Sequence, residues 1–320
     1  MSEAPSAKRP RSAATPGTTT ASSETKLERW TIGDVTVTKV HEITIPAPAQ
    51  GFFAECTPAD LEAHGWWSRP HFVDHDGNLV LSVHALVVES QGTRLVVDTC
   101  VGNDRNRPFS GWQGVSTNFM ERFSRAGFAP TRIDFVVCTH LHFDHVGWNT
   151  TLVDGRWVPT FPNARYLFGR VEYDHWNSAR HEPTAIPGTV SFDDSVRPVA
   201  EAGLMDLVES DRRLTDEVRL TPSPGHSPGH HCVVIESRGA TAVITGDSLH
   251  SPIQLAHPDW TSVADGDHET AARTRNRLRD AWAAEPVLVI GTHFATPTAG
   301  RVRHDEQGWW FDTGAGVSQT

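Results

Sequence analysis

Four side chains of the types that bind metal ions are crowded into the segment CTHLHFDHVGWN, residues 138–149. Six consecutive positions hold His140, His142, Asp144 and His145. Three histidines beside an acid would repel one another when charged and would each need a hydrogen-bond partner when neutral. A divalent cation satisfies all of them, because imidazole nitrogen and carboxylate oxygen are common metal ligands. The spacing therefore predicts a metal site.

Three further residues of these types stand where apolar runs end. His226 follows VRLTPSPG, Asp247 follows AVITG, and His293 follows VLVIGT. In α/β proteins, sites form at the carboxyl ends of strands, where loops can vary while the strands hold them in place. In the first segment, the first two histidines are two positions apart, so an extended backbone places both on one side. Asp144 and His145 are adjacent, so their side chains must point in different directions, which favours a second, neighbouring ion.

Strands dominate the secondary structure that the sequence predicts. Apolar runs predict strands over residues 30–43, 79–90, 93–100, 133–140, 164–169, 219–237 (two strands around a Pro/Gly turn), 241–247 and 286–294. Helices are predicted over residues 60–67, 115–128, 170–180 and 268–284, and a loop over residues 44–53. Much of the region 150–215 has no clear pattern. Because strands and helices do not alternate regularly, two sheets with helices outside fit better than one doubly wound sheet.

Composition and charge exclude several kinds of partner. The chain has 320 residues and a formal net charge of −11, which does not attract nucleic acid or anionic membranes. No run of about 18 apolar residues is present, so no transmembrane helix is expected. Residues 1–26 are rich in Ser, Thr, Ala and Pro and lack an apolar signal core, which predicts a disordered tail on a cytoplasmic protein. The four cysteines form no CxxC pair, and we expect buried free thiols.

The order of the motifs resembles the metallo-β-lactamase superfamily. The resemblance rests on five elements between residues 98 and 293: Asp98 in VVDT, the run HLHFDH, His226 in PGHSPGH, Asp247 in TGD and His293 in GTHF. It implies an α/β protein with a four-layer αββα sandwich, formed here by residues 27–320 as one domain. It also implies two divalent metal ions at the edge between the sheets.

The resemblance also assigns the ligands. One ion is expected on His140, His142 and His226, the second on Asp144, His145 and His293, with Asp247 bridging them. Nitrogen and carboxylate ligands without thiolate favour zinc and leave manganese, iron and cobalt open. Asp98 is expected either to orient a ligand histidine from behind or to cap backbone amides. His230 and His231 follow a further Pro-Gly turn, and we expect them to face elsewhere.

Among the branches of the superfamily, the chain resembles the quorum-quenching lactonases and the methyl parathion hydrolases. Only 27 residues follow His293, which leaves no room for the helical domain of the glyoxalase II type. The expected reaction is hydrolysis of a lactone or carboxylic ester by a hydroxide that bridges the ions, with Asp144 and Asp247 as catalytic residues. The alternatives are a phosphotriesterase or aryl-ester hydrolase and, less favoured, an iron-dependent redox protein.

The expected partner is a small ester or lactone. Residues near the motifs, or in the loop over residues 44–53, are predicted to contact it: Phe52, Phe53, Phe143, Trp148, Phe168, Trp176 and His250. Core packing is the alternative for several of the aromatic residues, and loop packing for His250. Related lactonases use a tyrosine near the site, but only Tyr166 and Tyr173 exist here, so that role stays open. Dimers are common among such enzymes, which makes a homodimer the expected assembly.

Overall fold

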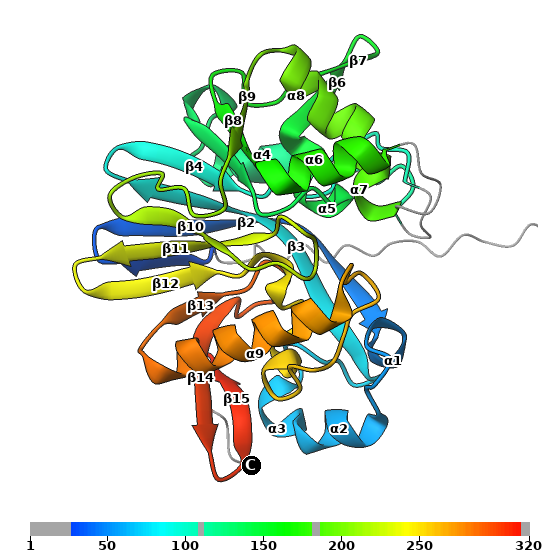
Figure 1. Ribbon diagram of the computed structural model, residues 1–320, viewed down its shortest axis with the longest axis vertical. Coiled ribbons are helices and arrows are strands. Elements are labelled where there is room, and N and C mark those ends of the chain that lie inside the picture. Colours follow the sequence, from blue (N-terminus) through cyan, green and yellow to red (C-terminus); the bar gives the residue numbers. More distant parts are fainter. Residues whose placement is uncertain (1–26, 108–111, 181–185, 315–320) are drawn as a thin grey trace, which may run out of the picture.

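Two β-sheets lie face to face in the computed structural model, which describes residues 27–107, 112–180 and 186–314 (Figure 1). The seven-stranded sheet has the order β1 (Arg29–Ile32), β2 (Val35–Pro48), β3 (Asn78–Ser90), β4 (Thr93–Val97), β5 (Phe135–Cys138), β8 (Arg165–Gly169) and β9 (Met205–Val208). The six-stranded sheet has the order β10 (Val218–Pro222), β11 (His231–Ser237), β12 (Ala240–Ile244), β13 (Leu288–Ile290), β14 (Ala299–Asp305) and β15 (Gly308–Asp312). A separate hairpin joins β6 (Thr150–Val153) and β7 (Arg156–Pro159).

Helices cover the outer faces of both sheets, so the order of layers is helix, sheet, sheet, helix (Figure 1). One side carries α4 (Phe119–Arg125), α5 (Phe143–Val146), α6 (Arg170–Ala179), α7 (Ile186–Ser191) and α8 (Arg197–Glu201). The other side carries α1 (Ala49–Phe52), α2 (Pro58–Ala63), α3 (Gly65–Ser68) and α9 (His268–Ala284). The four-layer arrangement expected from the motifs is confirmed.

Three apolar clusters fill the spaces between the layers. The central cluster joins the inner faces of the two sheets, for example Leu95 and Val137 with Val233 and Ile244. A second cluster lies between the seven-stranded sheet and its helices, and a third lies between the six-stranded sheet and α9. Alternate residues of β5 face the two sides, since Val137 belongs to the central cluster and its neighbours to the helix-side cluster. Strands buried on both faces explain the continuous apolar runs in the sequence.

The predicted strand over residues 30–43 is two strands, because the chain turns at Gly33. This residue has φ +58°, and a Cβ there would lie 2.3 Å from the Ser237 carbonyl oxygen. The prediction of a loop over residues 44–53 was wrong, since β2 pairs with β3 as far as Pro48 and α1 follows. Pro46 and Pro48 are tolerated in β2 because β1 pairs only with its first residues, Val35 to Thr38. The later part of β2 is an edge of the sheet on that side, where no backbone N–H group is needed for pairing.

The remaining predictions about helices, strands and cysteines had mixed outcomes. The helix over residues 268–284 has the predicted bounds, and the helix at 170–180 differs from α6 by one residue. In the region 150–215, the structure confirms the predicted strand as β8 and adds β6, β7, β9, α7 and α8, which were not predicted. The hairpin of β14 and β15 was not predicted. The four cysteines are free and buried, as expected, whereas the predicted tail, residues 1–26, lies outside the described residues. Among the helices that the structure describes, none has the length and apolarity needed to cross a membrane.

Candidate metal centre

The ends of four strands and one short helix bring the seven predicted ligands together. His140 and His142 follow β5, whose next turn is α5 with Asp144 and His145. His226 lies on the loop between β10 and β11. Asp247 and His293 follow β12 and β13, which are parallel neighbours and therefore end at the same edge of the sheet. The grouping by strand ends that the sequence predicted is present in the fold.

The first group comprises His140, His142 and His226. The His226 Nε2 atom is 3.2 Å from His140 Nε2 and 2.9 Å from His142 Nδ1. Nitrogens that bind one zinc ion at 2.0–2.1 Å in tetrahedral geometry lie about 3.3 Å apart. Burial holds the pKa values of His140 and His142 well below the usual range, so these rings are neutral and able to bind a cation.

The second group comprises Asp144, His145 and His293. The two histidine Nε2 atoms are 3.3 Å apart, and the Asp144 oxygens lie 3.7 Å from His145 and 3.6 Å from His293. Burial opposes charge on both rings, but Asp247 and the other nearby carboxylates outweigh it and raise the pKa of both histidines, that of His145 well above the usual value. Without a cation, these shifts favour the positively charged form of both rings.

Asp247 spans the two groups. Its Oδ2 atom lies 3.3 Å from His145 Nε2 and 3.4 Å from His226 Nε2, and its Oδ1 atom lies 3.2 Å from His293 Nε2. Burial opposes the charge on this carboxyl, but the surrounding histidines hold its pKa well below the usual range. Its buried Oδ1 atom has the ion-pair contact with His293 but no further hydrogen-bond partner among the described residues. A buried oxygen of this kind is costly unless a cation meets it, so the donor set fits two metal ions.

Asp98 fulfils both roles that the sequence left open. Its Oδ2 atom accepts a hydrogen bond from His145 Nδ1 at 2.9 Å, and its Oδ1 atom accepts one from the Thr139 backbone N–H at 2.8 Å. His293 is oriented by a carbonyl instead, since its Nδ1 donates to the Ser82 oxygen at 3.1 Å. Such contacts fix which nitrogen of each ring faces the cluster.

The sequence analysis missed a second carboxylate, Asp265, that contacts a predicted ligand histidine from behind, as Asp98 does. Asp265 accepts a hydrogen bond from His226 Nδ1 at 3.1 Å, and its other oxygen pairs with Arg275 at 3.1 Å. Both side chains are buried, and Arg275 also donates to the carbonyl oxygens of Pro258 and Trp260. Asp265 lies in an irregular loop before α9, where no spacing or periodicity marks it.

The expectation that His230 faces elsewhere was wrong. Its Nε2 atom accepts a hydrogen bond from the Asp247 backbone N–H at 2.8 Å, and its Nδ1 contacts Ser223. A Cβ at Gly246 would lie 2.4 Å from His230 Nε2, so the ring packs directly beneath the Asp247 turn. His231 is fully buried, and its ring nitrogens have no hydrogen-bond partner in the described part of the chain.

Three of the predicted substrate-contact residues lie beside the cluster. His250 Nε2 is 3.3 Å from Asp247 Oδ2, and His226, Asp247 and His250 together could also hold an ion. The Phe52 ring meets the His250 ring edge-on, with centroids 5.2 Å apart. The Trp176 ring meets His142 in the same way at 5.4 Å. These residues form the aromatic neighbourhood of the ligand histidines.

The other predicted contacts lie elsewhere. Phe53 is fully buried between Phe52 and Trp260, and Phe143 packs against Trp112. Trp148 and Phe168 belong to the helix-side core, which corrects their assignment to the substrate pocket. Trp148 stacks on Phe119 and donates to the buried Glu42, while Phe168 points into the same core from β8. A position next to the histidine motif in sequence therefore did not direct these side chains towards the ligands, and they pack in the apolar clusters instead.

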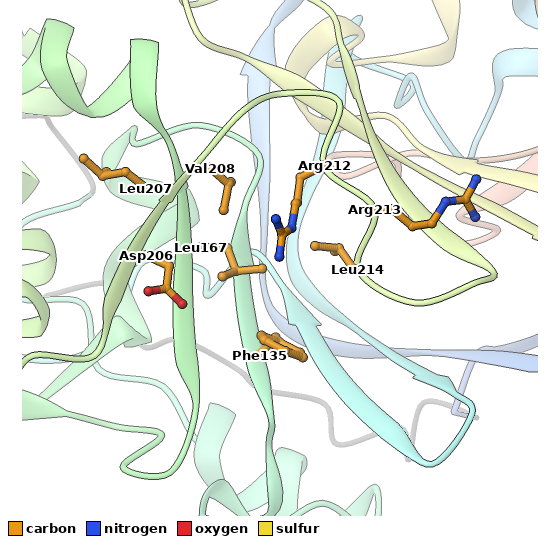
Figure 2. Close-up of a pocket in the computed structure, with 8 residues that line it drawn as sticks. All are labelled: Phe135, Leu167, Asp206, Leu207, Val208, Arg212, Arg213 and Leu214. Atoms are coloured by element: carbon orange, nitrogen blue, oxygen red, sulfur yellow. The ribbon is translucent and has the colours of Figure 1, made fainter.

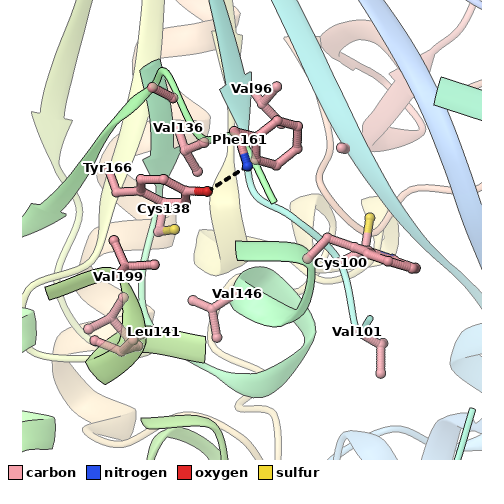
Figure 3. Packing of buried hydrophobic residues seen from close by; sticks show 14 of the residues in the cluster. Val96, Cys100, Val101, Val136, Cys138, Leu141, Val146, Phe161, Tyr166 and Val199 are labelled. Atoms are coloured by element: carbon pink, nitrogen blue, oxygen red, sulfur yellow. Dashed lines mark hydrogen bonds between the residues drawn. The ribbon is translucent and has the colours of Figure 1, made fainter. Parts of the chain in front are cut away.

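Both tyrosines belong to the helix-side layer of the seven-stranded sheet. Tyr166 is buried in the helix-side core, where its hydroxyl donates to the Asn149 carbonyl and accepts from the Phe161 N–H (Figure 3). Tyr173 packs against Phe192 in the same layer. Tyr166 therefore does not fill the role of a tyrosine near the site, which the sequence left open.

A surface pocket of about 340 Å³ lies away from the cluster. Its lining consists of Phe135, Leu167, Asp206, Leu207, Val208, Arg212, Arg213 and Leu214 (Figure 2). Phe135 is the first residue of β5, whereas His140 follows the last, so the pocket and the cluster occupy opposite ends of this strand. None of the seven predicted ligands lines it.

Comparison with known proteins agrees with this geometry. A family model described as the metallo-beta-lactamase superfamily matches residues 79–293. An N-acyl homoserine lactonase of Bacillus cereus is 25% identical over 170 residues, which span 53% of this chain and 59% of that relative. One of Bacillus thuringiensis is 26% identical over 169 residues, or 52% of this chain and 58% of the relative. The matched segment thus covers less than two thirds of either relative.

Solved structures share the fold over most of the chain. The hydrolase AbOPH of the beta lactamase superfamily superposes with a TM-score of 0.72 at 20% identity, covering 89% of this chain and 96% of the other. AidC, a dizinc quorum-quenching lactonase solved with a product, gives a TM-score of 0.68 at 18% identity and the same coverage. At these identities the superpositions establish the architecture.

Proposed function

The chain belongs to the metallo-beta-lactamase superfamily, and we propose that it hydrolyses a lactone or another carboxylic ester at a centre of two divalent metal ions. The observation that carries the proposal is the buried cluster of five histidines and two aspartates, whose facing atoms lie at distances suited to shared cations. Structural ion pairs do not require five imidazoles around two carboxylates. Paired metal ions do.

Each of the two groups would hold one ion. His140, His142 and His226 would hold one ion, Asp144, His145 and His293 the other, and Asp247 both. We propose zinc, because the set contains imidazole and carboxylate without thiolate and permits tetrahedral spacing. When bound, the ions supply a water that ionises near neutral pH and a Lewis acid for the ester carbonyl.

Asp144 is the residue we propose to carry a proton to the leaving alcohol. Its side chain is 17% exposed, whereas that of Asp247 is 4% exposed and that of His145 is 1% exposed. A carboxylate that reaches solvent can exchange a proton through its free oxygen, which the buried carboxylate cannot do. Asp247 instead keeps its negative charge between the groups, as its lowered pKa requires.

The substrate would lie against Phe52, Trp176 and His250. The first is partly exposed and touches His250, and the second touches His142, so an apolar acyl chain could contact both rings near the ions. His250 offers two buried ring nitrogens without a hydrogen-bond partner among the described residues. The relatives carry the name of N-acyl homoserine lactonases, so these lactones are the first substrates to assay.

The test combines metal analysis with a substrate panel. Purified protein is stripped with a chelator and reloaded with zinc, manganese, iron or cobalt, and bound metal is counted. We expect about two ions per chain and turnover of lactones or aryl esters only after reloading. Turnover of phosphotriesters above that of carboxylic esters would favour the alternative hydrolase. Activity only with iron, coupled to electron transfer, would favour the redox alternative, and fewer than two ions in every form would refute the dinuclear centre.

Assembly and location remain proposals of their own. A homodimer is expected by analogy with related enzymes, and light scattering coupled to size-exclusion chromatography measures it directly. We propose a cytoplasmic location on the basis of the four free cysteines. Fractionation of cells that express the full chain tests this.

A further inference from the structure

Glu172 is a buried carboxylate with three N–H donors around it. It lies in the first turn of α6 and is 1% exposed. Its Oε1 atom accepts hydrogen bonds from the Leu141 backbone N–H at 3.1 Å and from the Trp176 indole N–H at 2.6 Å. Its Oε2 atom accepts one from the Gly229 backbone N–H at 2.9 Å. In the described part of the chain, it forms no ion pair with a basic residue.

The two backbone donors belong to the two loops that supply the first group of ligands. Leu141 lies between His140 and His142, and Gly229 is three residues after His226. The second loop also packs directly on the helix, since a Cβ at Gly229 would lie 2.3 Å from the Glu172 backbone nitrogen. One carboxylate therefore links loops that are more than eighty residues apart in sequence, as the separation of 84 between His142 and His226 shows.

The third donor, the Trp176 indole, packs against the His142 ring. In four ligand histidines, the nitrogen that faces away from the cluster has an oxygen partner: Thr139 Oγ1 for His140, Asp98 for His145, Asp265 for His226 and the Ser82 carbonyl for His293. Among the described residues, the hydrogen-bond contact of the His142 ring is the one between its Nδ1, which faces the cluster, and His226 Nε2. The His142 ring is held by packing against Trp176, and Trp176 is held by Glu172.

We propose that Glu172 is the positioning residue of the first metal group. It sets the distance between the two ligand loops through Leu141 and Gly229, and it fixes the orientation of His142 through Trp176. Its place in the first turn of a helix also favours the negative charge that these donors require. The inference rests on the proposed function, since it assumes that the cluster holds metal ions.

The decisive variant is Glu172→Gln. An amide has a single acceptor oxygen, so its NH2 group must face either the Gly229 N–H or the pair of N–H groups of Leu141 and Trp176. Either choice places donor against donor and releases one of the two loops. Glu172→Ala removes all three acceptors and is the second variant. The matched control is Glu217→Gln, because Glu217 likewise uses both carboxylate oxygens as acceptors, for Ser90 and Ser237, but lies directly before β10.

The readouts are independent of turnover. Zinc affinity is measured on folded, metal-free protein by competition with a chromophoric chelator, and the visible spectrum of the cobalt form reports the geometry of each site. We expect Glu172→Gln to weaken one of the two ions ten- to a hundredfold and to change one cobalt band, as loss of an outer contact to a metal ligand typically does. Glu217→Gln should leave both readouts at the wild-type value.

The outcomes separate this inference from the proposed function. Fewer than two ions on the wild-type protein would refute the dinuclear centre itself. Two ions on the wild type, with the same affinities and cobalt spectrum in Glu172→Gln, would overturn the role of Glu172 alone. A merely structural role would lower the melting temperature of the metal-free variant without changing metal affinity below that temperature, and this result would also overturn it.

Discussion

Replacing Asp265 by asparagine tests whether the carboxylate behind His226 matters as the structure indicates. The side chain is nearly isosteric, so packing is preserved while the negative charge is lost. Arg275, of which 1% of the side chain is exposed, would then keep its hydrogen bonds to the Pro258 and Trp260 carbonyls without a facing anion. The lowered pKa of Asp265, held down against burial by its hydrogen bond to His226, shows that the native pair is charged.

The expected size of the effect follows from the burial of the pair. Removing one partner of a buried ion pair costs about 3–5 kcal/mol, because the other charge is left uncompensated. Asparagine can still accept the hydrogen bond from His226 Nδ1, so we expect the lower end, about 3 kcal/mol. For a domain of about 290 residues, whose entropy of unfolding is about 0.6 kcal/mol/K, that corresponds to a fall in Tm of about 5 °C for the metal-free protein. Zinc affinity should fall about tenfold or more, since the acceptor of the ligand histidine loses its charge.

Thermal unfolding in the presence of a chelator, followed by circular dichroism, measures the first effect. Asp280→Asn is the control, because Asp280 is an exposed acid on α9 paired with Arg279, and exposed pairs contribute little. The double variant Asp265→Asn with Arg275→Met removes both charges and should recover part of the lost stability. A Tm for Asp265→Asn within about 1 °C of the control, one fifth of the expected shift of about 5 °C, would refute this reasoning. A double variant that is destabilised by more than the sum of the two single variants would refute it as well.

Three further predictions follow from the site and its surroundings. Asp247→Asn should retain less than two ions by elemental analysis and lose most turnover, and two tightly bound ions would contradict its bridging position. Chelators should abolish turnover while serine-directed inhibitors have no effect; the reverse result would exclude a metal-dependent mechanism. Burial lowers the pKa of His231 from 6.5 to about 4. As the pH falls, this histidine therefore takes up its proton in the unfolded chain before it does so in the folded protein. The stability that the neutral ring supplies above pH 6.5 is lost as the pH falls towards 4. The loss is about 3 kcal/mol, and urea unfolding of metal-free protein at pH 7.5 and 5 should show a weaker pH dependence for His231→Gln; an equal dependence would contradict the buried, neutral ring.

The grouping of the seven predicted ligands could be anticipated because their types and positions are visible locally. His140, Asp247 and His293 each follow an apolar run that can only be a buried strand, and parallel strands end at a common edge. The layers were predictable for a similar reason, since runs that are apolar on both faces require cover on both sides.

The residues behind the ligands could not be found in this way. Asp265 and Glu172 are single acids in a sequence with 39 acidic residues, and nothing in their spacing distinguishes them. Each acquires its role from loops brought together by the fold: Asp265 meets His226 across 39 positions, and Glu172 meets Gly229 across 57. His230 was misjudged for the same reason, because its contact with the Asp247 turn depends on how β11 and β12 pair.

Several aromatic residues were wrongly predicted to contact the substrate, because a position near a motif in sequence does not determine where the side chain points. Trp148 lies three residues after His145, yet the chain turns through a short 3-10 segment and the indole enters the core, where Glu42 accepts its N–H. Phe52 came from a segment predicted as a loop, and it reaches the cluster because β2 extends beyond its partner β1 and delivers α1 to the site.

The charges around the cluster explain why so many histidines can be buried together. Asp144 and Asp247 lie among the ligands, and Asp98 and Asp265 lie behind His145 and His226. Two divalent cations, as we propose for the cluster, would carry four positive charges and would match these four carboxylates, while Glu172 and Arg275 would carry opposite charges in the surrounding layer. In the absence of cations, the same carboxylates attract protons instead, and they raise the pKa of His145 and His293 for that reason. Metal binding would then displace protons from the second group more than from the first, whose rings burial keeps neutral. The carboxylates therefore do more than orient single rings, because together they make the buried cluster a place where positive charge is required.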